Sequence, residues 1–317
     1  MSGQSSSISR RDVLGAGVTA AAGLSVASRS APAAEPGGNP AAGFIDAHVH
    51  VWTAATERYP LAPGYAKEKM VVPSFTPEEL FGHARPCGVR RIVLIQMSYY
   101  GCDNSYMLAM MKKHKGVFSG VAIVDLSADP RAAMRELAKE GVRGFRIVAG
   151  NQAPERWLAG ESMAAMWQCG ADEGLAICPL MDPQYIPSVD SMCRKFPQTP
   201  VVVDHFARIG IDGQIHPADL ENLCALAGHK RVRVKVSAFY ALGKKKAPYL
   251  DLGPMIRRLR DAFGPERLMW ASDSPFQVIG GHHYRDSVEL VRERLDFLTP
   301  TDRDWLLKRT AEQTFFG

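Results

Sequence analysis

From residue 43 onward, short apolar runs rich in β-branched residues alternate with segments in which apolar residues recur every three or four positions. This pattern predicts strands and helices that follow one another in turn. The expected strands are residues 44–51, 91–97, 118–125, 144–148, 175–180, 201–206, 232–238 and 268–272. The expected helices are residues 78–84, 105–114, 130–140, 162–173, 186–195, 218–227, 254–263, 284–297 and 303–315.

The expected strands are almost continuously apolar, which is typical of a parallel sheet that is covered on both faces. Eight strand–helix units in about 270 residues predict a (β/α)8 TIM barrel, an α/β fold that forms a single domain over residues 43–317. A doubly wound open sheet is the alternative. No GxGxxG sequence follows any expected strand, which excludes the commonest nucleotide-binding form of that alternative.

The first 42 residues have a different composition. Arg10 and Arg11 precede an Ala/Gly-rich apolar run at 13–27, and Ala31-Pro32-Ala33 offers a small-residue cleavage site. This pattern resembles a bacterial twin-arginine export signal over residues 1–33, followed by a Pro/Gly-rich linker at 34–42. We therefore expect a periplasmic protein. The apolar run is shorter than the ~20 residues that span a bilayer, so we expect no stable membrane insertion.

Composition and charge narrow the function classes. The chain has 46% hydrophobic and 22% charged residues, as in a soluble globular protein, and a net charge of +5. This small excess is dispersed, which argues against nucleic acid as a partner. The densest basic stretches, residues 230–235 and 244–246, are expected to be solvated loops or strand ends. The six cysteines show no metal-binding spacing, and we expect them to be buried.

Polar residues stand at the ends of three expected strands, where catalytic groups of a barrel gather. His48 and His50 close the first strand, and their spacing of two puts them on one face. His205 lies at the end of the sixth strand and Asp273 at the end of the eighth. Because the eighth strand of a closed barrel lies beside the first, these four side chains can converge. They fit either a Zn²⁺ site or a metal-free acid–base cluster.

Several motifs, taken together and in order, resemble the amidohydrolase, or metal-dependent hydrolase, superfamily over roughly residues 43–316. Within it, the chain is similar to the branch of 2-pyrone-4,6-dicarboxylate lactonase and the sugar-lactone hydrolases. The motifs are Phe44-Ile45-Asp46-Ala47-His48-Val49-His50, Tyr100-Gly101-Cys102-Asp103-Asn104, Gly141-Val142-Arg143-Gly144-Phe145-Arg146, Val203-Asp204-His205 and Trp270-Ala271-Ser272-Asp273-Ser274-Pro275.

The resemblance implies a hydrolase that opens a cyclic ester by attack of activated water on the carbonyl. It implies that Asp273 is the general base, and that His48, His50 and His205 polarise the carbonyl directly or through a metal. These four residues are the expected ligands if a metal is bound. The chain has neither a bridging Lys or Glu at the fourth strand nor a His at the fifth, where Cys178 stands. We therefore expect one divalent ion, zinc or manganese, or none.

The expected substrate is a small carboxylated or sugar-derived lactone. Arg146 and Arg208 match arginines that bind substrate in the dicarboxylate lactonase, and a guanidinium suits a carboxylate. Further candidates for substrate binding follow the second and seventh strands; they are Ser98, Tyr100, Asn104 and Tyr240. Phe239-Tyr240-Ala241 stands where the dicarboxylate lactonase has a further Arg, and Ser274-Pro275-Phe276 where it has Trp-Pro-His, which argues against the dicarboxylate itself.

Two alternatives remain open from the sequence. The first is a non-oxidative decarboxylase of an aromatic or unsaturated acid on the same barrel, although such enzymes usually add a fifth-strand His as a metal ligand. The second is an exported binding protein that has lost its chemistry. Replacing Asp273 would separate them, because it should abolish turnover and preserve ligand binding. The oligomeric state is left open by the sequence, and a homodimer is among the options.

Overall fold

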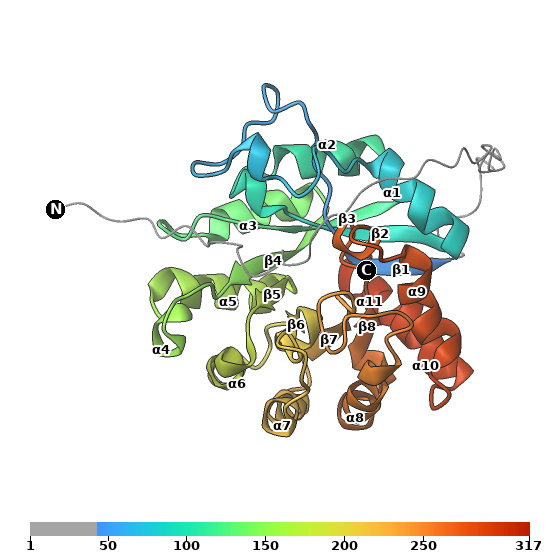
Figure 1. The fold of residues 1–317 in the computed structure, drawn as a ribbon. Helices are drawn as coiled ribbons and strands as arrows, with labels where there is room; N and C mark the ends of the chain where they lie inside the picture. Colours follow the sequence, from blue (N-terminus) through green and yellow to red (C-terminus); the bar gives the residue numbers. More distant parts are fainter. Residues whose placement is uncertain (1–42) are drawn as a thin grey trace, which may run out of the picture. The chain divides into compact units, whose positions relative to one another are not determined.

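The computed structural model describes residues 43–317, in which eight parallel strands form a nearly closed barrel (Figure 1). Each strand pairs with the next along the chain, so the strand order is the chain order. This order confirms the eight expected strands and excludes the doubly wound open sheet. The strands are β1 (Phe44–Val49), β2 (Val89–Ile95), β3 (Phe118–Ala122), β4 (Val142–Val148), β5 (Ala176–Leu180), β6 (Val201–Val203), β7 (Val232–Val236) and β8 (Leu268–Trp270).

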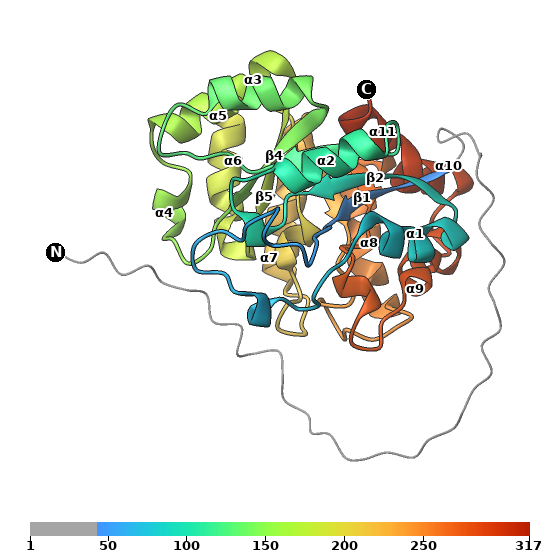
Figure 2. The same cartoon turned by 90° about the horizontal axis from the view of Figure 1, so that it is seen from above.

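Helices connect the strands and cover the outside of the barrel (Figures 1 and 2). They are α1 (Pro77–Ala84), α2 (Ser105–Lys113), α3 (Arg131–Lys139), α4 (Pro154–Trp157), α5 (Glu161–Glu173), α6 (Ile186–Lys195), α7 (Pro217–Ala225), α8 (Gly253–Phe263), α9 (Tyr284–Glu289), α10 (Pro300–Asp304) and α11 (Thr310–Phe315). The two expected C-terminal helices are interrupted by wider π turns at Leu290–Arg294 and Trp305–Arg309.

The apolar core has an inner and an outer layer. Alternate residues of the strands, such as Ile95, Val202 and Met269, fill the inside of the barrel. Phe315 of α11 belongs to the same inner cluster, so the last helix helps to fill the barrel. The other strand residues pack outward against the helices. Because both faces are covered, the strands are mostly apolar, and polar groups inside the barrel carry a desolvation cost.

Six of the eight strands end two or three residues earlier than expected, and two of these endings shape the site. Residues 201–206 and 268–272 were expected to be extended, but β6 ends at Val203 and β8 at Trp270. His205 and Asp273, which follow these strands, have φ angles of 51° and 64°. Extended backbone requires a negative φ, so the chain leaves the sheet where these side chains begin. Both side chains therefore lie on the loops that follow the strands.

The barrel is closed where β1 meets the chain after β8. The amide of Asp273 donates to the carbonyl of His48 over 2.9 Å, and the amide of His50 donates to the carbonyl of Ser274 over 2.8 Å. Val49 and Ser274 form a parallel bridge. These main-chain bonds hold Asp273 directly opposite the two histidines of β1.

The Asp46 carboxylate reinforces this seam from inside the protein. Its Oδ1 accepts hydrogen bonds from the amides of Ser272, over 2.9 Å, and His48, over 3.2 Å. Its Oδ2 accepts one from the Tyr284 hydroxyl over 2.7 Å. Burial raises the pKa of Asp46 to about 6. Asp46 therefore ties β1, the end of β8 and α9 together.

The expected export signal (residues 1–33) and linker (residues 34–42) lie outside the described residues. Among residues 43–317, no helix is long and apolar enough to cross a membrane.

Replacing Asp46 should weaken the whole fold. In Asp46→Ala, two buried amides and one buried hydroxyl lose their acceptor, so we expect the free energy of unfolding to fall by about 3 kcal/mol. Urea denaturation measures this loss. Asp296→Ala is the control, because Asp296 is exposed and pairs weakly with Arg257, and it should change stability by less than about 0.5 kcal/mol. Equal effects of the two substitutions would contradict the role of Asp46.

Candidate active site

A local irregularity in β1 turns both histidines into the barrel mouth. Ile45 and Ala47 belong to the inner cluster, so regular alternation would point His48 outward. The pairing of β1 with β2 shifts register between Asp46 and Val49. Such an irregularity re-aims the following side chains. The Nε2 atoms of His48 and His50 consequently lie 3.2 Å apart, and both side chains are buried.

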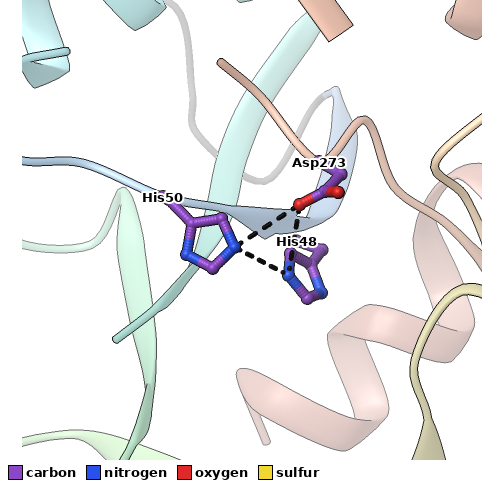
Figure 3. Close-up of side chains that lie close together, drawn as sticks. All are labelled: His48, His50 and Asp273. Carbon is purple, nitrogen blue, oxygen red and sulfur yellow. Dashed lines mark hydrogen bonds and ion pairs between the residues drawn. The ribbon is translucent and has the colours of Figure 1, made fainter. Parts of the chain in front are cut away.

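Asp273 completes a compact group with these two histidines (Figure 3). Its Oδ1 lies 3.5 Å from Nε2 of His48 and 3.4 Å from Nε2 of His50. Its Oδ2 accepts a hydrogen bond from the Tyr240 hydroxyl over 2.6 Å. Oδ1 is buried and finds no hydrogen-bond donor among the described residues. One oxygen of the carboxylate is thus held, and the other is free for chemistry.

The surroundings set the charges of this group. Burial lowers the pKa of His48 well below its usual value and lowers that of His205 to about 4, so both imidazoles are neutral at neutral pH. Burial acts to raise the pKa of Asp273, but the neighbouring imidazoles outweigh it and the pKa lies well below its usual range. Burial and the Asp273 carboxylate raise the pKa of Tyr240, which stays a phenol. Asp273 is therefore a proton acceptor beside neutral imidazoles.

His205 joins the group from the loop after β6. Its ring centroid lies 4.3 Å from that of His48, and its Nε2 lies 3.7 Å from Oδ2 of Asp273. Its Nδ1 lies 2.8 Å from the hydroxyl of Ser237, which follows β7. Ser237 thereby orients the imidazole, as a hydrogen bond to one ring nitrogen commonly does.

His205 begins an unusual left-handed turn. Four consecutive residues, His205, Phe206, Ala207 and Arg208, have φ angles between 51° and 57°. L-residues avoid this region because Cβ approaches the following carbonyl oxygen, at about 1–2 kcal/mol per residue. Phe206 and Ala207 are fully buried, so packing holds the turn. Strained backbone of this kind gathers at functional sites, and here it aims His205 at Asp273.

A buried ion cluster lies against His48 on the side away from Asp273. Asp204 and Lys235 are fully buried, with Lys235 Nζ 2.9 Å from Asp204 Oδ1. Arg146 Nε lies 3.4 Å from Asp204 Oδ2. Burial acts to raise the pKa of Asp204, but Lys235, His48 and Arg146 together lower it well below its usual range. Lys235 Nζ also lies 3.1 Å from Nδ1 of His48.

The spacing of the first group fits a metal ion. Donor atoms about 2.0–2.2 Å from a tetrahedral metal lie roughly 3.3–3.6 Å from one another. The three separations among His48 Nε2, His50 Nε2 and Asp273 Oδ1 are 3.2, 3.5 and 3.4 Å. His48, Asp204 and His205 form a second group of candidate ligands. That group is already in contact with a cation, the Lys235 ammonium.

Protonation is the second criterion for a metal, and the first group does not meet it as long as Lys235 donates to His48. A ligating imidazole must offer a lone pair. Lys235, as an ammonium, can only donate to His48 Nδ1. The neutral His48 ring then carries its proton on Nε2, where the metal would bind. In this form the donor set does not fit a metal, and the chemistry of the site falls to its own side chains.

The structure places the residues expected to bind substrate in different settings. Arg146 is nine-tenths buried, and its Nε finds no hydrogen-bond acceptor among the described residues. Arg208 is partly exposed and pairs with Asp182 over 2.8 Å. Tyr240 contacts Asp273 directly. Ser98, another of the six expected residues, is half-buried in the turn after β2.

Tyr100 and Asn104 are engaged by the main chain. The Tyr100 hydroxyl accepts a hydrogen bond from the amide of Thr53. The Asn104 amide group donates to the carbonyls of Cys102 and Ile123 and accepts from the amide of Ile123. Asn104 therefore links the loops after β2 and β3. A role of either residue in substrate binding stays a prediction.

Sequence reasoning missed Lys235, Asp204 and Ser237. The expectation that the basic stretch 230–235 is solvated was wrong for Lys235, which is fully buried. The available signal was the alternation along β7, because the valines at 232, 234 and 236 pack outward and put Lys235 on the inner face. The expectation for the cysteines holds for five of them, but Cys102 is exposed in the loop after β2.

The chain is similar to enzymes that open lactones. A family model described as amidohydrolase matches residues 45–317. An L-fucono-1,5-lactonase from Burkholderia ambifaria is 28% identical over 243 residues, which cover 75% of this chain and 82% of that protein. A 2-pyrone-4,6-dicarboxylate hydrolase from Comamonas testosteroni is 27% identical over 272 residues, covering 82% and 85% of the two chains.

Solved structures share the fold. A candidate 2-pyrone-4,6-dicarboxylic acid hydrolase from Pseudomonas putida superposes with a TM-score of 0.72 at 26% identity. The match covers 86% of this chain and 97% of that chain. The likeness thus extends over the whole barrel.

The left-handed turn can be tested through Ala207. A glycine there relieves the strain but removes a buried methyl, so Ala207→Gly should stay within about 1 kcal/mol of the parent stability. Ala207→Val should cost more than about 2 kcal/mol, because a β-branched residue is a severe outlier at this φ and must also be accommodated in a packed core.

Ala164, within α5, is the matched control for these variants. In a right-handed helix Ala164→Gly should lower the free energy of unfolding by about 1 kcal/mol. Urea denaturation compares the two sites. A loss on Ala207→Gly larger than that on Ala164→Gly, with Ala207→Val no worse than Ala207→Gly, would show that residue 207 is not held left-handed.

Proposed function

The chain belongs to the amidohydrolase family, and on this premise we propose that it hydrolyses a lactone to the open hydroxy acid. The names of both curated relatives describe enzymes that act on cyclic esters, and the two relatives match most of this chain. The observation that carries the proposal is the position of Asp273. A buried carboxylate with one unengaged oxygen faces two imidazoles at the mouth of a barrel.

In the proposed reaction, Asp273 accepts a proton from a water molecule whose oxygen attacks the lactone carbonyl. The carbonyl oxygen gains negative charge, and imidazole N–H groups at the mouth stabilise that charge. The bond between the carbonyl carbon and the ring oxygen then breaks. Asp273 returns its proton to the departing ring oxygen, which becomes the hydroxyl of the product. Tyr240 keeps the carboxylate oriented through Oδ2.

Arg146 is the group best suited to bind an anionic substituent of the lactone. Its buried guanidinium has donors that no described protein atom uses. Charge-assisted hydrogen bonds from such a fork to a carboxylate are strong and directional. Arg208 already pairs with Asp182, so it has less capacity for a second carboxylate. This supports a lactone with one carboxylate, or a hydroxylated sugar lactone, as substrate.

The decarboxylase alternative is less well supported. Enzymes of that kind usually hold their metal with an additional histidine on the fifth strand. Cys178 stands there, fully buried, and burial raises the pKa of its thiol to about 12. A buried thiol in this state is neither a nucleophile nor a ready metal ligand.

A lactone panel tests the proposed function. We expect the protein to open L-fucono-1,5-lactone or a muconolactone faster than 2-pyrone-4,6-dicarboxylate. A pH indicator measures the reaction through the proton that the acid product releases. Asp273→Asn should reduce kcat by at least about 100-fold, since it removes the general base. The control is Asp212→Asn, an exposed residue paired with His216, which should leave kcat unchanged. A folded parent protein that opens no lactone and instead releases CO₂ from an aromatic acid would reject the proposal.

Arg146 can be tested by comparing two substrates. Arg146→Gln should raise KM for a carboxylated lactone by about 10- to 100-fold, because it removes a charge-assisted contact. For a neutral sugar lactone KM should change far less. Arg208→Gln is the comparison variant, because Arg208 is partly exposed and already pairs with Asp182. If Arg146→Gln changes both KM values equally, Arg146 does not recognise the carboxylate.

A further inference from the structure

A chain of hydrogen bonds runs from Lys235 through both histidines to the main chain of β2. Lys235 Nζ lies 3.1 Å from His48 Nδ1, and His48 Nε2 lies 3.2 Å from His50 Nε2. His50 Nδ1 lies 2.9 Å from the carbonyl oxygen of Ile95. An ammonium can only donate and a carbonyl can only accept. The two ends therefore fix the direction of every bond between them.

The direction assigns the proton of each ring. His48 Nδ1 accepts from Lys235, so the proton of this neutral imidazole is on Nε2. His48 Nε2 donates to His50 Nε2, and His50 Nδ1 donates to Ile95. No other arrangement of two neutral rings makes all three contacts hydrogen bonds. His48 thus presents an N–H, rather than a lone pair, beside Asp273 Oδ1.

Lys235 is fixed firmly enough to impose this arrangement. Its side chain is fully buried, with Nζ 2.9 Å from Asp204 Oδ1 and 5.7 Å from the ring centroid of Phe315. Asp204 is in turn held near Arg146. The ammonium therefore lies inside the barrel, buried between the Asp204 carboxylate and an aromatic ring.

The His48 proton has one competing position. Asp204 Oδ1 lies 3.4 Å from His48 Nδ1 and could accept a proton placed there. His48 would then expose its Nε2 lone pair, which is the form that a metal requires. The contact of Lys235 with Nδ1 decides between the two forms, so metal binding at His48, His50 and Asp273 opposes this contact.

We propose that Lys235 is a positioning residue that keeps the proton of His48 on Nε2 and thereby holds the site in a form with low affinity for divalent metal. When a lactone binds, this N–H exchanges its contact with His50 Nε2 for a hydrogen bond to the carbonyl oxygen. The inference rests on the active site of the proposed function, but not on the identity of the lactone.

The tautomer of His48 in the metal-free parent protein is the first test. Long-range proton–nitrogen NMR on the full chain labelled at histidine distinguishes the two ring nitrogens, and the His48→Asn spectrum identifies the His48 signals. We expect a protonated Nε2 and an unprotonated Nδ1. A proton on Nδ1, or on both nitrogens, would overturn the inference. This readout needs no Lys235 variant to fold.

Zinc titration of Lys235→Met against the parent protein is the second test. Without the ammonium, the His48 proton should move to Nδ1 and the Kd for Zn²⁺ should fall by at least about tenfold, as other changes in groups that orient metal ligands do. Lys113→Met removes an exposed lysine that pairs with Glu78 and should leave the Kd unchanged.

The variant spectrum separates the tautomer from the loss of charge. If zinc binds more tightly but the His48 proton stays on Nε2, the charge alone is responsible and the inference fails. A Kd that is unchanged or weaker in Lys235→Met also overturns it. Neither measurement uses a lactone, so their outcome is independent of whether the proposed hydrolysis is found.

Discussion

The seam between β1 and the chain after β8 is the constraint on which the site depends. A parallel barrel has to bring its last strand back to its first, and here main-chain hydrogen bonds make that closure at the residues that carry chemistry. Asp273 donates its amide to the carbonyl of His48, so the main chain that carries the carboxylate is tied to the strand that carries the imidazole. The Asp46 carboxylate stabilises the same closure by accepting hydrogen bonds from the amides of Ser272 and His48.

Buried charge is the second feature that shapes the site. An isolated Lys235 or Asp204 inside the barrel would be strongly unfavourable, and their ion pair compensates for much of that cost. The pair also acts on the histidines, because the ammonium that neutralises Asp204 is the donor that faces His48 Nδ1. A group that the fold needs for charge balance thus sets the proton position of a residue at the active site.

The residues at strand ends were predictable, since their place follows from alternation and from the order of the strands. His48, His50, His205 and Asp273 were found in this way, and the structure brings all four together. The metal question could not be decided from sequence, because it depends on which nitrogen of one ring carries a proton. That in turn depends on Lys235, which comes from a strand on the other side of β8.

Other features of the structure could not be predicted from the local sequence pattern, and the reasons differ. The register shift in β1 and the left-handed turn after β6 are backbone conformations imposed by packing, and no glycine marks either. Asn104 and Tyr100 stand where ligand contacts were expected, but their polar atoms bond to the main chain of neighbouring loops. Polar residues at a barrel mouth can serve the loops as well as the substrate, and only their partners distinguish the two.

A crystal structure of Asp273→Asn with an unhydrolysed lactone would test the central claim most directly. The account predicts the carbonyl oxygen within hydrogen-bond distance of His48 Nε2, about 2.7–3.1 Å, with the carbonyl carbon facing residue 273. Any carboxylate of the lactone should lie against Arg146. A lactone bound away from these groups, or a metal ion between the lactone and the His48 and His50 rings, would contradict it.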